Sequence, residues 1–200
     1  MNTLDKRSLV AREAARLLYY GFAKEYIQAK AIAATNLETK IIPSNFEVAI
    51  ELDKISEELE GLERQTRLLE MRKTAQKIMN SVHNFQPIMI GSVWRGTIRK
   101  GSDIDIIALA FDSQKVGESL QKFELLEKGE TNFKGGIKAY HYKITSDGFT
   151  IDVVVRRPDE YTPEKCDVYG DKKNGLNLNE LEKLLNVDPL RRFVPKRRIR

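Results

Sequence analysis

Apolar residues recur at spacings of three and four over the first part of the chain and change to strand-like runs after residue 86. Within residues 8–35 they share one helical face, with charged residues between them, which predicts a helix. Pro43 interrupts this pattern, and Ser44 and Glu47 then form a capping-box sequence that starts a second helix. This helix extends to residue 82. Because it would be about 55 Å long if unbroken, we expect a bend near Gly61.

The second predicted helix carries an apolar seam in alternating steps of four and three: Val48, Leu52, Ile55, Leu59 and Leu62. Such a seam is typical of a coiled coil, and equally of one helix in a packed antiparallel pair. The short connection to the preceding helix favours the pair. A partner on this helix, including a second copy of the chain in a dimer, remains an alternative.

The pattern after residue 86 predicts a sheet. Short apolar strands are expected over residues 87–90 and 103–111, followed by a helix over 112–126. A hairpin opens at Gly135-Gly136 and has arms 137–145 and 149–156 around the turn Ser146-Asp147-Gly148. A last helix follows, capped by Asn177 or Asn179. The chain thus divides into a helical segment (1–83), a core (84–160) and a C-terminal helix with a basic tail (161–200).

Composition sets limits on this picture. The chain has 200 residues and is 41% apolar, enough for one domain, or a small domain with a helical appendage. No apolar run approaches the length of a membrane span, and residues 1–7 lack an apolar signal core. The single cysteine, Cys166, excludes an internal disulfide and fits a reducing compartment. We therefore expect a cytoplasmic protein without a membrane segment.

The positive charge is concentrated at the C-terminus. The formal net charge is +5, and residues 191–200 carry six basic residues and no acid. The rest of the chain therefore has a charge of about −1. A basic tail of this kind often contacts nucleic acid; a solvated end is the other interpretation, and both remain open.

Two aspartates supply the candidate chemistry. Asp103 and Asp105 are two residues apart on a predicted strand, so both point to one face of the sheet. Like charges side by side are costly, and a cation between them removes that cost. Oxygen ligands suit Mg²⁺, or Mn²⁺ in its place. Because the strand after them is apolar, these carboxylates need partners.

A candidate anion site precedes the aspartates. Gly91 and Ser92 follow a predicted strand and open a helix, whose free amides attract an anion. The Ser92 hydroxyl adds a donor, and Arg95 can pair with a phosphate oxygen. Just before the aspartates, Gly101 and Ser102 suit a close approach of the backbone to a ligand.

A third carboxylate comes from the hairpin. Phe149, Ile151 and Val153 face one way on the second arm, whereas Asp152 faces the other. An acid isolated in an apolar arm is a candidate for the third ligand of a two-metal site; an edge-strand acid that faces solvent is the alternative. His83 and His141 lie far apart in the sequence and make no zinc site.

These motifs resemble those of the DNA polymerase beta superfamily of nucleotidyltransferases, over residues 86–156. The resemblance implies an α+β fold, a small mixed sheet with helices on one face. It also implies that Asp103 and Asp105 bind two Mg²⁺ ions and that Asp152 binds the catalytic ion and helps to deprotonate the acceptor hydroxyl. Gly91, Ser92 and Arg95 would hold the phosphates of a nucleoside triphosphate.

The expected function is transfer of a nucleoside monophosphate, from ATP or another triphosphate, to an acceptor hydroxyl with release of pyrophosphate. The basic tail 191–200 makes RNA, such as tRNA, one possible acceptor. The helical segment, together with Ser44, resembles a group of uncharacterised archaeal nucleotidyltransferases, whereas the large base-binding domain of better-known members has no counterpart. The alternative function is a non-catalytic nucleic-acid-binding module that uses the tail.

Overall fold

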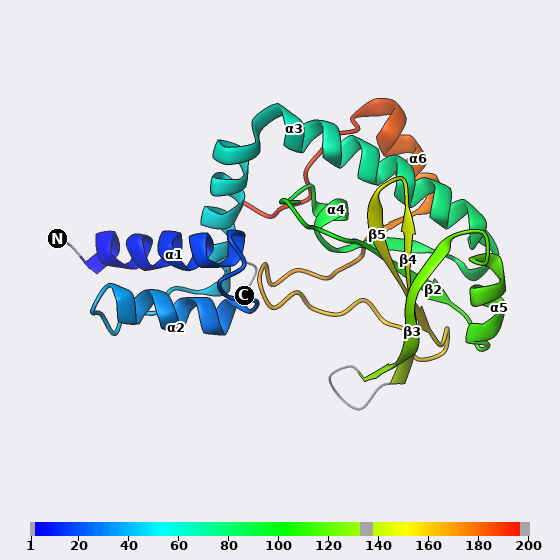
Figure 1. Cartoon of the computed structure of the whole chain (residues 1–200), viewed down its shortest axis with the longest axis horizontal. Helices are drawn as coiled ribbons and strands as arrows, with labels where there is room; N and C mark the ends of the chain where they lie inside the picture. Colours follow the sequence, from blue (N-terminus) through cyan, green and yellow to red (C-terminus); the bar gives the residue numbers. More distant parts are fainter. Residues whose placement is uncertain (1–2, 133–137, 197–200) are drawn as a thin grey trace.

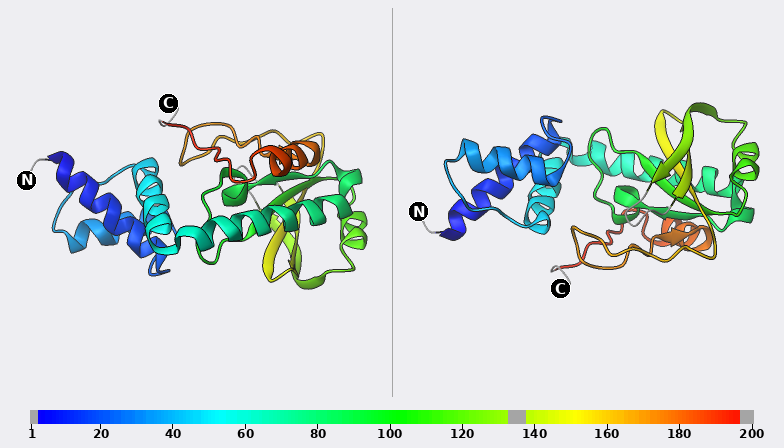
Figure 2. Two further views of the ribbon diagram at one scale, coloured as in Figure 1. Left: turned by 90° about the horizontal axis from the view of Figure 1, so that it is seen from above. Right: turned by 90° about the horizontal axis from the view of Figure 1, so that it is seen from below.

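The computed structural model describes residues 3–132 and 138–196. The molecule is elongated: helices α1 and α2 and the start of α3 form one end, and the sheet lies at the other (Figures 1 and 2). No helix of the described residues is long and apolar enough to cross a membrane.

The helical end consists of α1 (Thr3–Tyr19), α2 (Tyr26–Asn36) and the first part of α3 (Asn45–Ser81). The single helix expected over residues 8–35 is wrong. Gly21 adopts a positive φ of 76°, which ends α1 and turns the chain back. Small side chains let the helices approach closely, because this core is built largely of alanines. The Arg7–Glu47 ion pair, at 2.6 Å, ties α1 to α3.

Helix α3 links the two ends. Ser44 and Glu47 form the predicted capping box. The predicted bend is also confirmed, because Gly61 leaves the helical region with φ 49° and ψ −126°. Before the bend, α3 packs within the chain against α1, which it crosses (Figure 1). The antiparallel pairing predicted across the short connection is therefore not what the structure shows, because that connection joins α3 to α2. After the bend, α3 packs against the sheet. Leu59 and Leu62 flank the bend and are exposed.

Six strands form one mixed sheet in the order β3-β4-β5-β2-β1-β6. Their bounds are β1 Ile88–Ile90, β2 Ile104–Leu109, β3 Glu124–Asn132, β4 Lys138–Ser146, β5 Phe149–Arg156 and β6 Leu176–Asn177. Strands β2 and β5 run parallel, and the other neighbours are antiparallel. The turn Asp147-Gly148 joins β4 to β5 as predicted; Gly135-Gly136 lie outside the described residues.

The helix expected over residues 112–126 is shorter than predicted. Helix α5 covers Ser113–Ser119, and Asp112, not Ser113, caps it. Residues 124–132 form the edge strand β3, on which Leu125 and Leu126 are exposed. The last helix, α6 (Leu178–Val187), is capped by Asn177, one of the two predicted residues.

All helices that contact the sheet pack on one face, which confirms the predicted α+β architecture. The second part of α3, the short helix α4 (Gly91–Arg95), α5 and α6 share a core with alternate residues of the strands, among them Ile104, Ile106, Ile151 and Val153. The irregular segment 157–175 lies over part of the other face. The division of the chain at residues 83 and 160 remains a prediction.

Arg72 fixes α4 against this core. Its side chain is fully buried, and its guanidinium donates to four backbone carbonyls. Two belong to α4, Val93 at 3.2 Å and Trp94 at 3.0 Å, and two to the C-terminal segment, Pro189 at 2.6 Å and Arg191 at 2.9 Å. Arg72 therefore sets where the Gly91 turn, at the start of α4, meets the sheet.

Candidate active site

Strand pairing places two of the predicted aspartates side by side. Asp105 on β2 is the register partner of Asp152 on the parallel strand β5. On the other side of β2, Asp105 pairs with Ile90, the residue before Gly91. Both carboxylates lie on the sheet face away from the helices, because Ile104, Ile106, Ile151 and Val153 occupy the core face. Asp103 comes one residue before β2, at the same end.

Gly91 lies directly against the carboxylate of Asp105. A Cβ atom at Gly91 would come 2.0 Å from Asp105 Oδ2 and 2.9 Å from Cγ. Gly91 also adopts a positive φ of 73°, which L-residues with a side chain rarely do. Glycine is therefore required at position 91 for two reasons: the backbone has a positive φ, and a side chain would collide with Asp105. The turn and the aspartate, predicted separately, form one unit.

The carboxylates repel each other in a partly buried setting. Burial raises the pKa of Asp105 to about 7, and the charges of Asp152 and Asp103 add to this effect. Burial likewise raises the pKa of Asp152. Asp152 Oδ1 is buried without a hydrogen-bond partner. In residues 3–132 and 138–196, no group of three or more His, Cys, Asp or Glu side chains is already arranged around a metal position.

Two basic residues on β4, Lys143 and His141, also adjoin the aspartates, which the sequence analysis does not predict. Lys143 is the register partner of Asp152, and its Nζ lies 3.6 Å from Asp103 Oδ2. His141 Nδ1 lies 3.9 Å from Asp152 Oδ1. Lys143 lowers the pKa of Asp105 and of Asp152, and His141 that of Asp152, which partly offsets burial. His141, which the sequence analysis assigned to no site, thus faces Asp152.

The two serines have different surroundings. Ser102 closes the turn before Asp103: its amide donates to the Arg99 carbonyl at 3.0 Å, and its hydroxyl accepts from the Arg99 amide at 2.9 Å. Ser92 lies in the first turn of α4, where Ile90 supplies no side-chain cap. Nothing in α4 therefore competes for the amides that begin the helix.

Arg95 does not join the site. It is 5% exposed, and its guanidinium donates to both carboxylate oxygens of Asp171 at 2.8 and 3.1 Å and to the Phe193 carbonyl at 2.9 Å. It also lies between the rings of Trp94 and Tyr169, 4.4 and 4.5 Å from their centroids. The predicted phosphate contact of Arg95 is therefore corrected: in this structure the side chain anchors α4 to the segment 157–175.

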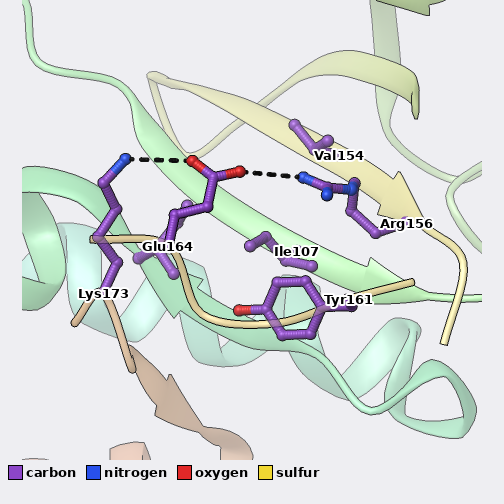
Figure 3. A pocket seen from close by; sticks show the side chains of 7 residues that line it. Ile107, Val154, Arg156, Tyr161, Glu164 and Lys173 are labelled. Carbon is purple, nitrogen blue, oxygen red and sulfur yellow. Dashed lines mark hydrogen bonds and ion pairs between the residues drawn. The ribbon is translucent and has the colours of Figure 1, made fainter. Parts of the chain in front are cut away.

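A pocket of about 90 Å³ lies on the same sheet face, next to the aspartates (Figure 3). Its floor is apolar and comprises Ile90, Ile107 and Val154. Its walls come from segment 157–175 and the end of β5, with Tyr161 on one side and the ion-paired chain Arg156–Glu164–Lys173 on the other.

Comparisons with known proteins give distant similarities. No family model and no curated protein matches the chain. A Cid1 poly(U) polymerase with bound Mg and 3′-dATP is 18% identical over 45% of this chain and 31% of that chain, with a TM-score of 0.35. The poly(A) polymerase complex GLD-2 – GLD-3 is 13% identical over 56% of this chain and 40% of that chain, with a TM-score of 0.35. In both comparisons the matched region spans less than half of the other protein's chain.

The contact between Gly91 and Asp105 yields a first prediction. Gly91→Ala should destabilise the protein by about 3 kcal/mol or more, because it combines the cost of a positive φ, about 1–2 kcal/mol, with displacement of the Asp105 carboxylate. Gly101→Ala is the matched control, since Gly101 has a φ of 79° and no atom within 4 Å of its Cβ position. Urea unfolding measures both. Equal losses in the two variants would contradict the contact.

The raised pKa of Asp105 yields a second prediction. Without divalent cations, the unfolded chain loses this proton near pH 4, whereas the folded protein keeps it to about pH 7. The contribution of Asp105 protonation to the free energy of unfolding is therefore fully present below pH 4 and is lost as the pH rises through 7. This loss is about 4 kcal/mol at most. Urea unfolding in EDTA at pH 5 and pH 8 measures the free energy of unfolding. Relative to the wild type, Asp105→Asn should be more stable at pH 8 than at pH 5. The same stability difference at both pH values would refute it.

Proposed function

We propose that the protein is a divalent-cation-dependent nucleotidyltransferase. The observation that carries this proposal is the pairing of Asp105 with Asp152 on adjacent parallel strands, beside Asp103 and against the Gly91 turn. Three carboxylates and a glycine turn that adjoin on one open face suit a reaction in which cations and a polyphosphate meet.

The carboxylates fit a pair of Mg²⁺ or Mn²⁺ ions. Hard cations take carboxylate oxygens, and Asp152 Oδ1 is a buried acceptor without a hydrogen bond. Asp103 and Asp105 would hold both ions, and Asp152 one of them. When bound, the ions supply charge neutralisation for the phosphates and for the attacking oxygen. Bound cations would also offset the burial and the carboxylate repulsion that together raise the pKa of Asp105.

The chain's own groups would bind and orient the two substrates. The backbone amides of Gly91 and Ser92, with the Ser92 hydroxyl, donate to the β- and γ-phosphates. Lys143 lies close enough to Asp103 to donate to a phosphate oxygen nearby. Asp152 orients the acceptor hydroxyl and accepts its proton. The acceptor oxygen then bonds to the α-phosphorus, the bond from this phosphorus to the bridging oxygen breaks, and pyrophosphate leaves with the electron pair.

RNA is the acceptor that the charge distribution favours. The described part of the basic tail is, however, partly structural: Arg192 pairs with Asp53, and the Phe193 amide donates to the Arg95 carbonyl at 3.0 Å. Arg197, Arg198 and Arg200 lie outside the described residues. Deleting the whole segment 191–200 would therefore disturb α4, whereas truncation after Lys196 leaves these contacts in place.

The catalytic proposal predicts transfer from a labelled triphosphate to RNA in the presence of Mg²⁺ or Mn²⁺. Asp103→Asn, Asp105→Asn and Asp152→Asn should each lower the rate by about a thousandfold or more, comparable to the loss of a principal electrostatic group. Asp159→Asn is the control, because Asp159 is an exposed turn residue paired with Arg157. Full activity in any of the three site variants, or no transfer by the wild type to any acceptor tested, would refute the proposal.

A non-catalytic nucleic-acid-binding module makes a different prediction. Removing residues 197–200 deletes three positive charges, so the slope of log affinity against log salt should fall by about two for single-stranded RNA. The three aspartate variants should leave this slope unchanged. Fluorescence anisotropy with labelled RNA at several salt concentrations measures it. An unchanged slope after truncation would exclude residues 197–200 as an RNA contact.

A further inference from the structure

The pocket of Figure 3 lies next to Asp105 and Asp152, along the same two strands, β2 and β5. Ile107 follows Asp105 by two residues on β2, Val154 follows Asp152 by two on β5, and the two are register partners. Two residues along a strand is about 7 Å. Whatever is attached to the group held at the aspartates therefore reaches the pocket without crossing any other element of the sheet.

The walls of the pocket offer both signs of charge above an apolar floor. Glu164 has a half-exposed side chain and lies 3.5 Å from Arg156 and 3.6 Å from Lys173. These long ion pairs leave the carboxylate able to accept from a ligand N–H, and the Lys173 ammonium able to donate to a ligand oxygen or ring nitrogen. Tyr161 presents its ring beside Ile107 (Figure 3). A flat ring with donors and acceptors on its edge matches this lining.

The size of the pocket limits the ring. Its volume of about 90 Å³ is smaller than the cavity of about 150 Å³ that admits benzene in an engineered protein. The pocket therefore accommodates only part of one six-membered ring, which enters edge first with its opposite edge toward the open side. A fused two-ring system would have to leave its second ring outside or displace the chain around Tyr161 and Glu164.

We propose that this pocket holds the base of the nucleoside triphosphate and selects single-ring pyrimidines over purines. Glu164 accepts from a base N–H, and Lys173 donates to a base acceptor. Arg156 is a positioning residue that holds Glu164 in place. This inference rests on the proposed function, because it is the triphosphate at the aspartates that brings the base to the pocket.

The test compares the four ribonucleoside triphosphates by isothermal titration calorimetry, with Ca²⁺ in place of Mg²⁺ to prevent turnover. UTP and CTP should bind about tenfold or more tightly than ATP and GTP, the range expected when a pocket is too small for part of a ligand. Equal affinities for all four would overturn the pocket assignment and leave the proposed function standing. If none of the four bound with any divalent cation, the proposed function would fail as well.

Substitutions at Val154 change the pocket in opposite directions. Val154→Ala enlarges it, so the affinity for ATP should rise and the preference for pyrimidines should shrink to less than threefold. Val154→Phe fills it, so the affinities for UTP and CTP should fall to those of the purines. Tripolyphosphate, which occupies only the aspartate end, should bind both variants as it binds the wild type, which shows that they are folded. An unchanged pyrimidine preference in both variants would overturn the inference.

Two glutamates in segment 157–175 provide the matched pair for the polar wall. Glu164→Gln should weaken UTP and CTP binding about tenfold and leave ATP unchanged. Glu160→Gln should change neither, because Glu160 pairs with Arg157 and does not line the pocket. The same effect from both substitutions would show that the charge of the segment matters and the pocket wall does not.

Discussion

The structure is organised around a repulsion that the backbone enforces. Parallel pairing of β2 with β5 holds Asp105 and Asp152 side by side, and burial keeps water from screening their charges. The result is an Asp105 carboxyl whose pKa is raised to about 7. Folding alone gains nothing from this arrangement. A site that binds cations does gain, because the free energy lost to repulsion in the empty site is recovered when the charge is neutralised.

The remaining elements hold Asp105 and Asp152 in place and leave them accessible. All sheet-packing helices lie on the opposite face, so the aspartate face is free for ligands except where segment 157–175 lies over it. Two arginines hold the Gly91 turn from behind: Arg72 binds the carbonyls of α4, and Arg95 fastens α4 to Asp171. Charge is thus concentrated where Asp105 meets the Gly91 turn, and the helices on the opposite face pack through an apolar core.

Features that depend on neighbouring residues could be predicted from the sequence. The capping box at Ser44, the bend at Gly61 and the alternation that turns Asp152 away from the core follow from neighbouring residues. The two-residue turn at Asp147 also fixes the register of β4 against β5, so the pairing of Lys143 with Asp152 could have been counted from the sequence. The strand over residues 124–132 was missed because its apolar Leu125 and Leu126 lie exposed on an edge.

Long-range features could not be counted in this way. Arg95 was expected to bind phosphate because its neighbours suggested a phosphate turn, but Asp171, 76 residues later, takes its guanidinium. The pocket walls come from an irregular segment without periodicity. The most direct measurement of the central claim is the binding of Mn²⁺, followed by electron paramagnetic resonance in the presence of a non-hydrolysable nucleoside triphosphate. The account predicts bound Mn²⁺ in the wild type and its loss in Asp105→Asn; equal binding by the two proteins, or none by the wild type, would contradict it.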